Sequence, residues 1–301
     1  MEQRPPRSAY AAALGMTAAF GLSFVATKYA LRGFQPLLVA LLRFTLAGAV
    51  LWVVWRLRSP QERASRQDLR RLALLGFVSL TVYFSFENFG IARTSASSAS
   101  ILIATIPIFV VVLNAFTLKE HTSGRLWLGI LLSFAGVAAL VGFGGAAGGG
   151  LRGDLLVLAA SLTAAVYSLL ARRLLVGRSA LFVTTWQNLF GALFMLPLAA
   201  LEAVVAGVRQ PTTAAAAGVL FLTGVCSITA YLLLNYAFRF LEASRVSVFI
   251  NLTPIVAVVA AYVLLGERFT TGQAVAAVVV VAGVWLTNSG RASAVRSPSA
   301  G

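Results

Sequence analysis

Glu87 is the residue whose type and position most strongly suggest chemistry in this chain. It lies inside a long apolar run at residues 72–92, whereas the other acidic residues, apart from Glu202, fall in more polar segments. A carboxyl group within a membrane span costs about 2.5–3.5 kcal/mol or more, so such residues usually mark a functional site. Two roles fit Glu87: binding the ammonium group of an amino acid, or exchanging a proton.

Two cations lie in similar apolar runs and leave a structural alternative open. If successive apolar runs cross a lipid bilayer in alternating directions, Lys28, Arg43 and Glu87 lie at about the same depth in that bilayer. A buried ion pair would then explain the carboxyl group without any function. Arg43 also fits bidentate binding of a substrate carboxylate, and the long side chain of Lys28 can reach the membrane interface.

Polar and aromatic residues recur near these charges at helical spacing. One set of four residues is spaced by 3, 4 and 4 positions, and a second set repeats that spacing. Residues at such intervals share one face of a helix. The first set is Gly76, Ser79, Tyr83 and Glu87, and the second is Gly224, Ser227, Tyr231 and Asn235. These faces either line a cavity or join helices to one another.

Five further polar or aromatic residues complete the candidate cavity. Asn88 and Asn251 lie near the two polar faces, and a cluster follows in the run 181–206. That cluster is Trp186, Gln187 and Asn188. Trp186 either stacks on a bound molecule or fills space, and the sequence does not decide between the two.

The chain as a whole is too apolar to fold in water. Of its 301 residues, 59% are hydrophobic and 11% are charged, where about 25% charged residues are usual in a soluble protein. Its apolar residues form runs of roughly the 20 residues that a helix needs to cross a bilayer. Ten candidate spans result: 10–31, 36–55, 72–92, 95–118, 125–143, 154–175, 181–206, 213–238, 244–265 and 272–288. The expected fold is an all-α integral membrane protein with the lipid bilayer as its solvent.

The basic residues are distributed as in a membrane protein and not as on a nucleic-acid surface. With the N-terminus in the cytoplasm, cytoplasmic segments hold 17 of the 24 Lys and Arg residues, and the opposite loops hold 5. This bias follows the positive-inside rule and predicts that both termini are cytoplasmic. A nucleic-acid surface would gather the charge on one folded face. The first run, about 22 residues long with Lys28 in it, is expected to be a membrane helix and not a signal peptide.

The inventory of reactive residues is small. One cysteine, Cys226, and one histidine, His121, exclude a disulfide framework and a Cys/His metal cluster. No segment resembles a nucleotide-binding loop, so ATP is not expected to drive the protein. Asp68 and Asp154 lie in polar segments far apart along the chain, which argues against a membrane enzyme. We expect no cofactor, no metal and no catalytic site.

The chain contains an internal repeat. Residues 96–137 match residues 243–284 without a gap, at an offset of 147. The matches beyond the apolar positions are Ser97 with Ser244, Ser100 with Ser247, Pro107 with Pro254, Glu120 with Glu267, and Gly136 with Gly283. With five spans in each half, the second half enters the membrane upside down. Inverted repeats of this kind are a recurring plan of secondary transporters, with the substrate near the midplane.

Two prolines in the repeat predict bends in the helices, and several small residues predict close helix packing. Pro107 and Pro254 lie mid-span, where each would remove one backbone hydrogen bond and kink its helix. We expect them to act as hinges. The small residues Gly129, Ser133, Gly136, Ala276 and Gly283 suit close helix packing, within the chain or in a homodimer.

The repeated segments resemble the EamA domain of the drug/metabolite transporter superfamily. The resemblance rests on residues 88–120 (NFGIARTSASSASILIATIP…LKE) and 237–267 (AFRFLEASRVSVFINLTP…LLGE), with GLSFVATKYAL at 21–31 and LLRF at 41–44. It implies one repeat at 10–143, a Gly-rich external linker at 144–153, a second repeat at 154–288 and a cytoplasmic tail at 289–301. No single short motif would be sufficient, and the pattern as a whole carries the resemblance.

The resemblance also implies a function. Members of this family usually export amino acids or related metabolites from bacteria, which predicts a multi-pass protein of the bacterial inner membrane and a small-molecule substrate. Efflux of drugs or other cationic compounds is the alternative. The alternatives from other functional classes are a membrane-embedded enzyme and a passive channel. The sequence does not determine the substrate, the direction of transport or the coupling ion.

Overall fold

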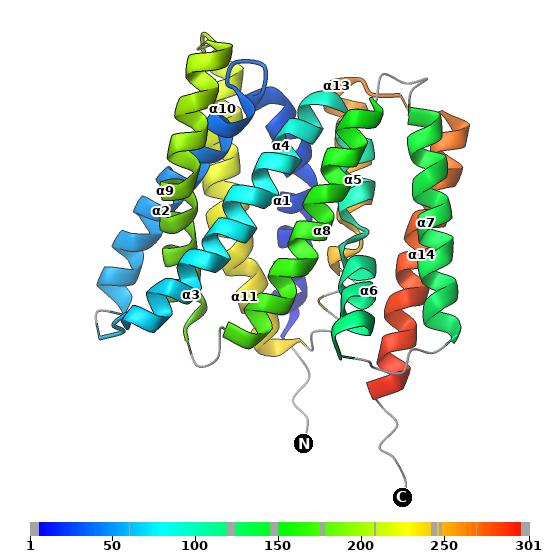
Figure 1. The fold of residues 1–301 in the computed structure, drawn as a ribbon, viewed down its shortest axis with the longest axis horizontal. Helices are drawn as coiled ribbons and strands as arrows, with labels where there is room; N and C mark the ends of the chain where they lie inside the picture. Colours follow the sequence, from blue (N-terminus) through cyan, green and yellow to red (C-terminus); the bar gives the residue numbers. More distant parts are fainter. Residues whose placement is uncertain are drawn as a thin grey trace, which may run out of the picture.

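The computed structural model describes residues 6–59, 61–118, 124–144, 150–174, 178–207, 209–241, 246, 249–268 and 270–295. In these ranges the chain is helical, with turns between the helices and no β-strand. Figure 1 shows a bundle whose first helix begins at the same end of the molecule as the last helix finishes.

The helices follow one another with short connections. The first half contains α1 (Arg7–Ala30), α2 (Pro36–Arg58), α3 (Arg66–Gly76), η1 (Phe77–Val82), α4 (Tyr83–Arg93), α5 (Ala96–Ile103), α6 (Ile106–Leu118) and α7 (Gly124–Gly144). The second half contains α8 (Leu151–Leu174), α9 (Ala180–Ala206), α10 (Thr213–Phe221), η3 (Leu222–Thr229), α11 (Ala230–Phe240), α13 (Thr253–Leu265) and α14 (Thr271–Val295).

The helices have the length and polarity of membrane spans. Among the described residues, seven helical stretches are long and apolar enough to cross a bilayer. Three further apolar helices are shorter: Trp127–Gly142, Thr253–Leu265 and Thr271–Leu286. Large apolar side chains such as Leu131, Leu193 and Val263 are exposed, whereas polar side chains such as Glu87 and Arg43 are buried. This distribution suits a lipid environment.

The helical stretches 66–93 and 213–240 each contain a π-helical segment at the same place in the repeat. Residues 66–93 form one continuous helix in which η1 joins α3 to α4, and η3 joins α10 to α11 in the same way. Within η3, the Thr229 hydroxyl donates to the Gly224 carbonyl oxygen at 2.9 Å, five residues back. π-Helical turns are rare and occur often at functional sites. Both segments contain residues of the two polar faces.

The two repeat prolines lie where helices begin, which differs from the expected mid-span kinks. The expected fourth span is broken at Ala104–Thr105, and α6 begins at Ile106, one residue before Pro107. The expected ninth span has a turn at Asn251–Leu252, and Pro254 is the second residue of α13. Proline is well tolerated in the first turn of a helix because the N–H that it lacks has no partner there. The prolines therefore start new half-helices.

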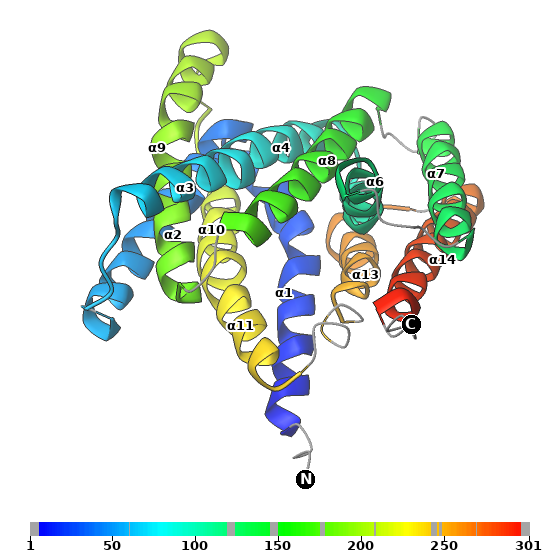
Figure 2. The same ribbon diagram turned by 60° about the horizontal axis from the view of Figure 1, so that its bottom comes forward.

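The expected fifth and tenth spans form a closely packed pair at one edge of the bundle. Helices α7 and α14 pack side by side in both views (Figures 1 and 2). Gly283 lies where their backbones come closest. A methyl group added there would lie 2.6 Å from the Ser133 nitrogen and 2.7 Å from the Gly129 carbonyl oxygen. The small residues of the repeat thus allow close packing within the chain.

We predict that Gly283→Ala destabilises the protein, because backbone atoms of α7 must move to admit the methyl group. Such overpacking costs about 1–3 kcal/mol. Thermal unfolding in detergent would measure the effect. Gly142→Ala on α7 is the matched control, since a methyl group there meets nothing within 4 Å. Equal melting temperatures for the two variants would contradict the predicted contact.

Candidate functional site

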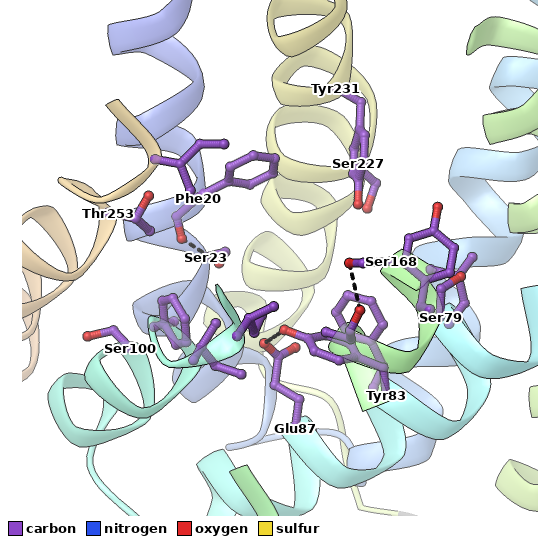
Figure 3. A pocket seen from close by; sticks show the side chains of 18 of the residues that line it. Phe20, Ser23, Ser79, Tyr83, Glu87, Ser100, Ser168, Ser227, Tyr231 and Thr253 are labelled. Atoms are coloured by element: carbon purple, nitrogen blue, oxygen red, sulfur yellow. Dashed lines mark hydrogen bonds between the residues drawn. The ribbon is translucent and has the colours of Figure 1, made fainter. Parts of the chain in front are cut away.

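Six buried polar side chains from the two halves line one cavity: Arg43, Glu87, Ser100, Gln187, Asn188 and Ser227. The cavity has a volume of about 410 Å³ and is lined from α1, α2, η1, α4, α5, α6, α8, α9, η3, α11 and α13. Figure 3 shows Tyr83, Glu87, Ser168, Ser227 and Tyr231, which come from α4, α8, η3 and α11, around a common space. Cavities of this size hold small molecules.

Glu87 contributes a carboxyl group to the wall of this cavity. It lies in the second turn of α4 and is 8% exposed. The Tyr83 hydroxyl, one helical turn earlier, donates to Glu87 Oε1 at 2.8 Å (Figure 3). This bond fixes one carboxyl oxygen and leaves Oε2 available to a bound molecule, because a carboxylate accepts several hydrogen bonds.

Arg43 lines the same cavity from α2. Its Nε donates to Ser227 Oγ at 2.6 Å, and its guanidinium carbon lies 4.8 Å from the ring centroid of Phe84. The side chain is 7% exposed. Although the structure describes both side chains, Arg43 and Glu87 do not form a direct ion pair. The cavity wall therefore presents a separate cation and a separate anion.

Helix α9 adds two amide side chains. Gln187 Nε2 donates to the Tyr167 hydroxyl at 3.1 Å, and Asn188 Nδ2 donates to the Thr184 carbonyl oxygen at 2.8 Å. A carbonyl oxygen only accepts, so the nitrogen of Asn188 must be the atom that faces Thr184. Asn188 Oδ1 is buried and has no partner among the described residues. A buried acceptor of this kind is costly unless a bound molecule satisfies it.

The two helix breaks open onto the cavity. Ala104 and Pro107 line it at the first break, and Asn251 and Pro254 line it at the second. Near a break, backbone groups are not all used within the helix, so they can bind a polar ligand. Tyr231 completes this part of the wall and packs edge-on against Phe20, with ring centroids 5.8 Å apart.

Three residues that the sequence grouped with the cavity lie elsewhere. Asn88 points toward α2, where its Nδ2 donates to the Pro36 carbonyl oxygen at 2.9 Å. Trp186 packs among aromatic rings, 6.0 Å from Trp55, so it fills space in the bundle. Lys28 does not line the cavity either, and it interacts electrostatically with Glu267.

The remaining candidates are placed as follows. Glu87, Tyr83, Arg43, Tyr231, Asn251, Gln187 and Asn188 line the cavity, as do Pro107 and Pro254. The side chain of Asn235 lies outside the part that the structure describes. Glu120 and His121 also lie outside the described residues.

Several lining residues were not singled out as site residues from the sequence. They include Ser23, Ser100, Tyr167, Ser168 and Thr184. Ser100 carries a signal, because it matches Ser247 in the repeat. Ser23, Ser168 and Thr184 have none, since Ser and Thr hydroxyl groups commonly bond to a carbonyl oxygen of the preceding turn in membrane helices. Ser168 does so with Ala164 at 2.8 Å. Among the described residues, no three His, Cys, Asp or Glu side chains gather as metal ligands.

Known proteins resemble this chain over almost its whole length. An uncharacterized transporter of Archaeoglobus fulgidus is 30% identical over 89% of this chain and 92% of its own. A probable terminal-alkyne amino-acid exporter of Streptantibioticus cattleyicolor is 30% identical over 88% of each chain. One solved crystal structure shares the fold, with a TM-score of 0.64 and 20% identity over 98% of this chain and 100% of its own.

The pattern of the EamA-like transporter family matches residues 7–142 and again residues 151–289. Together with the apolar helices, these relatives identify a multi-pass membrane protein. Because the family pattern occurs twice and covers most of the sequence, the chain belongs to the EamA-like transporter family.

Proposed function

We propose that this transporter carries amino acids or related small metabolites as a secondary exporter that works by alternating access. The observation that carries the proposal is the cavity of about 410 Å³ in which Glu87 and Arg43 are buried without pairing to each other. Two buried charges of opposite sign that share one cavity without direct contact complement a zwitterion.

The cavity wall offers a partner for each part of an amino acid. The Glu87 carboxylate binds the ammonium group, and the Arg43 guanidinium binds the carboxylate through the nitrogens that Ser227 does not occupy. Asn188 Oδ1 accepts a further hydrogen bond from the substrate. The rings of Phe20 and Phe84 provide an apolar surface for the substrate side chain. The exporter from Streptantibioticus cattleyicolor, named for amino acids, supports this substrate class.

We propose ten membrane spans in two inverted repeats, at 10–143 and 154–288, joined by an external linker at 144–153. Both termini, with a tail at 289–301, are cytoplasmic in this arrangement. The distribution of Lys and Arg supports it, and so does the common end of the bundle at which α1 begins and α14 finishes (Figure 1). Relatives from bacteria and the family pattern support a place in the bacterial inner membrane.

Alternating access is supported by the way both halves build one cavity. Each half contributes a broken span, and the breaks at 104–105 and 251–252 both reach the cavity wall. Rotation about such breaks can open one end of the pair while the other end closes, which is how inverted repeats exchange access.

Counterflow in proteoliposomes tests the function. The purified protein is loaded with one unlabelled amino acid, and the uptake of a panel of labelled amino acids is followed. Accumulation of one amino-acid class above empty liposomes would support the proposal and name the substrate. No exchange by correctly inserted protein would contradict it, and cationic compounds would then be tested, because Glu87 and the aromatic wall also suit a cation.

A further inference from the structure

A carboxylate from the second half holds the beginning of a helix in the first half. Glu267 Oε1 accepts from the Ala96 nitrogen at 2.8 Å, and Oε2 accepts from the Ser97 nitrogen at 3.0 Å and from Ser97 Oγ at 2.7 Å. Ala96 and Ser97, the first two residues of α5, are buried. All three bonds are charge-assisted, and the helix dipole adds to their strength.

The end of α13 is shaped so that Glu267 reaches this position. Gly266 ends the helix in the left-handed conformation, with a φ of +67°, which glycine adopts without strain. The Glu267 nitrogen then donates back to the Ala261 carbonyl oxygen at 3.2 Å. The end of α13 is also bound to α1, because the Tyr29 hydroxyl donates to the Leu264 carbonyl oxygen at 2.8 Å.

The two helices joined by Glu267 are half-helices that pack against each other. Helix α5 runs from Ala96 to the break at 104–105, and α13 runs from the turn at 251–252 to Leu265. The breaks at their inner ends lie in the wall of the cavity. Helices α5 and α13 are therefore joined by the Glu267 hydrogen bonds at one end, and each is interrupted by a helix break at the other end.

We propose that the Glu267 contact is the latch that closes the external end of the transport pathway. Passage of a substrate to the outside requires the three bonds to break and α5 and α13 to separate about the two breaks. This inference rests on the proposed function for its direction, since the distribution of charge places this end outside. Loss of the latch shifts the protein toward the outward-open state.

Helices α2 and α9 also form a pair held by carboxylates, but neither helix is broken. The two helices pack side by side, and carboxylates from the facing half hold both ends of the pair. Glu202 accepts from the Leu37 nitrogen at 2.9 Å at the end near Glu267, and Glu62 accepts from the Ser179 nitrogen at 3.1 Å at the other end. Helix α9 contains Pro197, yet it stays helical from Ala180 to Ala206, and α2 is also unbroken. We therefore assign α2 and α9 to the frame against which α5 and α13 move.

The test measures how fast a thiol behind the latch is labelled from outside. Ser100→Cys is the reporter, because Ser100 lines the cavity from α5, is 1% exposed and makes no bond to Glu267. Cys226, the one native cysteine, is replaced by alanine. A membrane-impermeant maleimide is added to right-side-out vesicles. Glu267→Gln is expected to raise the labelling rate about tenfold, because it removes one charge-assisted clamp from the closed state.

The matched control is Glu202→Gln, which neutralises a helix-capping carboxylate at the same end of the bundle but on unbroken helices. Its labelling rate should equal that of the reporter alone. Equal acceleration by both variants would mean general loosening and would overturn the latch, as would an unchanged rate in Glu267→Gln.

Labelling requires no substrate, so this result does not depend on the counterflow assay. Faster labelling in inside-out vesicles instead of right-side-out vesicles would overturn the external location. A failed amino-acid counterflow together with faster outside labelling would reject the substrate and leave the latch in place.

Discussion

Glu87→Gln is expected to reduce amino-acid counterflow by on the order of 100-fold. The loss of one partner of a buried charge pair, here Glu87 with the substrate ammonium group, costs about 2–5 kcal/mol. Glutamine has nearly the same shape and can still accept the hydrogen bond that the Tyr83 hydroxyl now donates to Glu87 Oε1 at 2.8 Å. The change therefore removes the negative charge that faces the substrate ammonium group and little else. Initial rates of exchange at equal amounts of reconstituted protein measure the effect.

Tyr83→Phe is the control, since it removes the hydroxyl group that orients Glu87 and keeps the charge. A smaller loss, about tenfold, is expected from one missing hydrogen bond to a charged group. Two assays on the same proteoliposomes, exchange and uptake driven by a pH gradient, distinguish substrate binding from proton transfer by Glu87. If exchange survives in Glu87→Gln but uptake driven by a pH gradient disappears, Glu87 carries the proton. If both activities remain intact, the carboxyl group is structural and the predicted role is wrong.

The composition of the site was largely predictable from the sequence because charges are rare in apolar helices. Glu87 and Arg43 stand out for that reason, and the 3, 4, 4 spacing of Ser79, Tyr83 and Glu87 placed these residues on one face. All of them line the cavity. Asn88 was grouped with the cavity through its neighbour Glu87, yet adjacent helical residues point about 100° apart, and Asn88 binds the backbone of α2.

The shape of the spans was less predictable. Pro107 and Pro254 located the breaks in the expected fourth and ninth spans, but a proline inside an apolar run is compatible with a kink or with a new helix start. In the π-helical segments η1 and η3, backbone hydrogen bonds join residues five apart and not four apart, and no residue type specifies that change. Contacts between distant segments, such as Arg43 with Ser227, require the packing of helices that the sequence alone does not give.

Arg43→Lys is expected to reduce exchange of amino acids by on the order of 100-fold although the positive charge is kept. The guanidinium of Arg43 is planar, lies 4.8 Å from the ring centroid of Phe84 and donates from Nε to Ser227 Oγ at 2.6 Å. That bond turns the two terminal nitrogens toward other partners, and together they match the two oxygens of a carboxylate. A lysine ammonium is a point charge that cannot reproduce the fork or the stacking on the ring. Ser227→Ala, which removes only the orienting hydroxyl, should cost several-fold.

Substrate analogues show whether Arg43 acts through the carboxylate. The wild-type protein should prefer an amino acid over its carboxamide, which has no negative charge, and Arg43→Gln should lose that preference. An unchanged preference in Arg43→Gln would contradict the assignment.

The double variant Glu87→Gln with Arg43→Gln separates binding from a structural ion pair, because neutralising both partners of a pair restores what either single change destroys. The two side chains, both described, make no direct ion pair, so we expect the double variant to be as inactive as the worse single variant. Recovery of exchange in the double variant would show that the two charges serve each other and not the substrate.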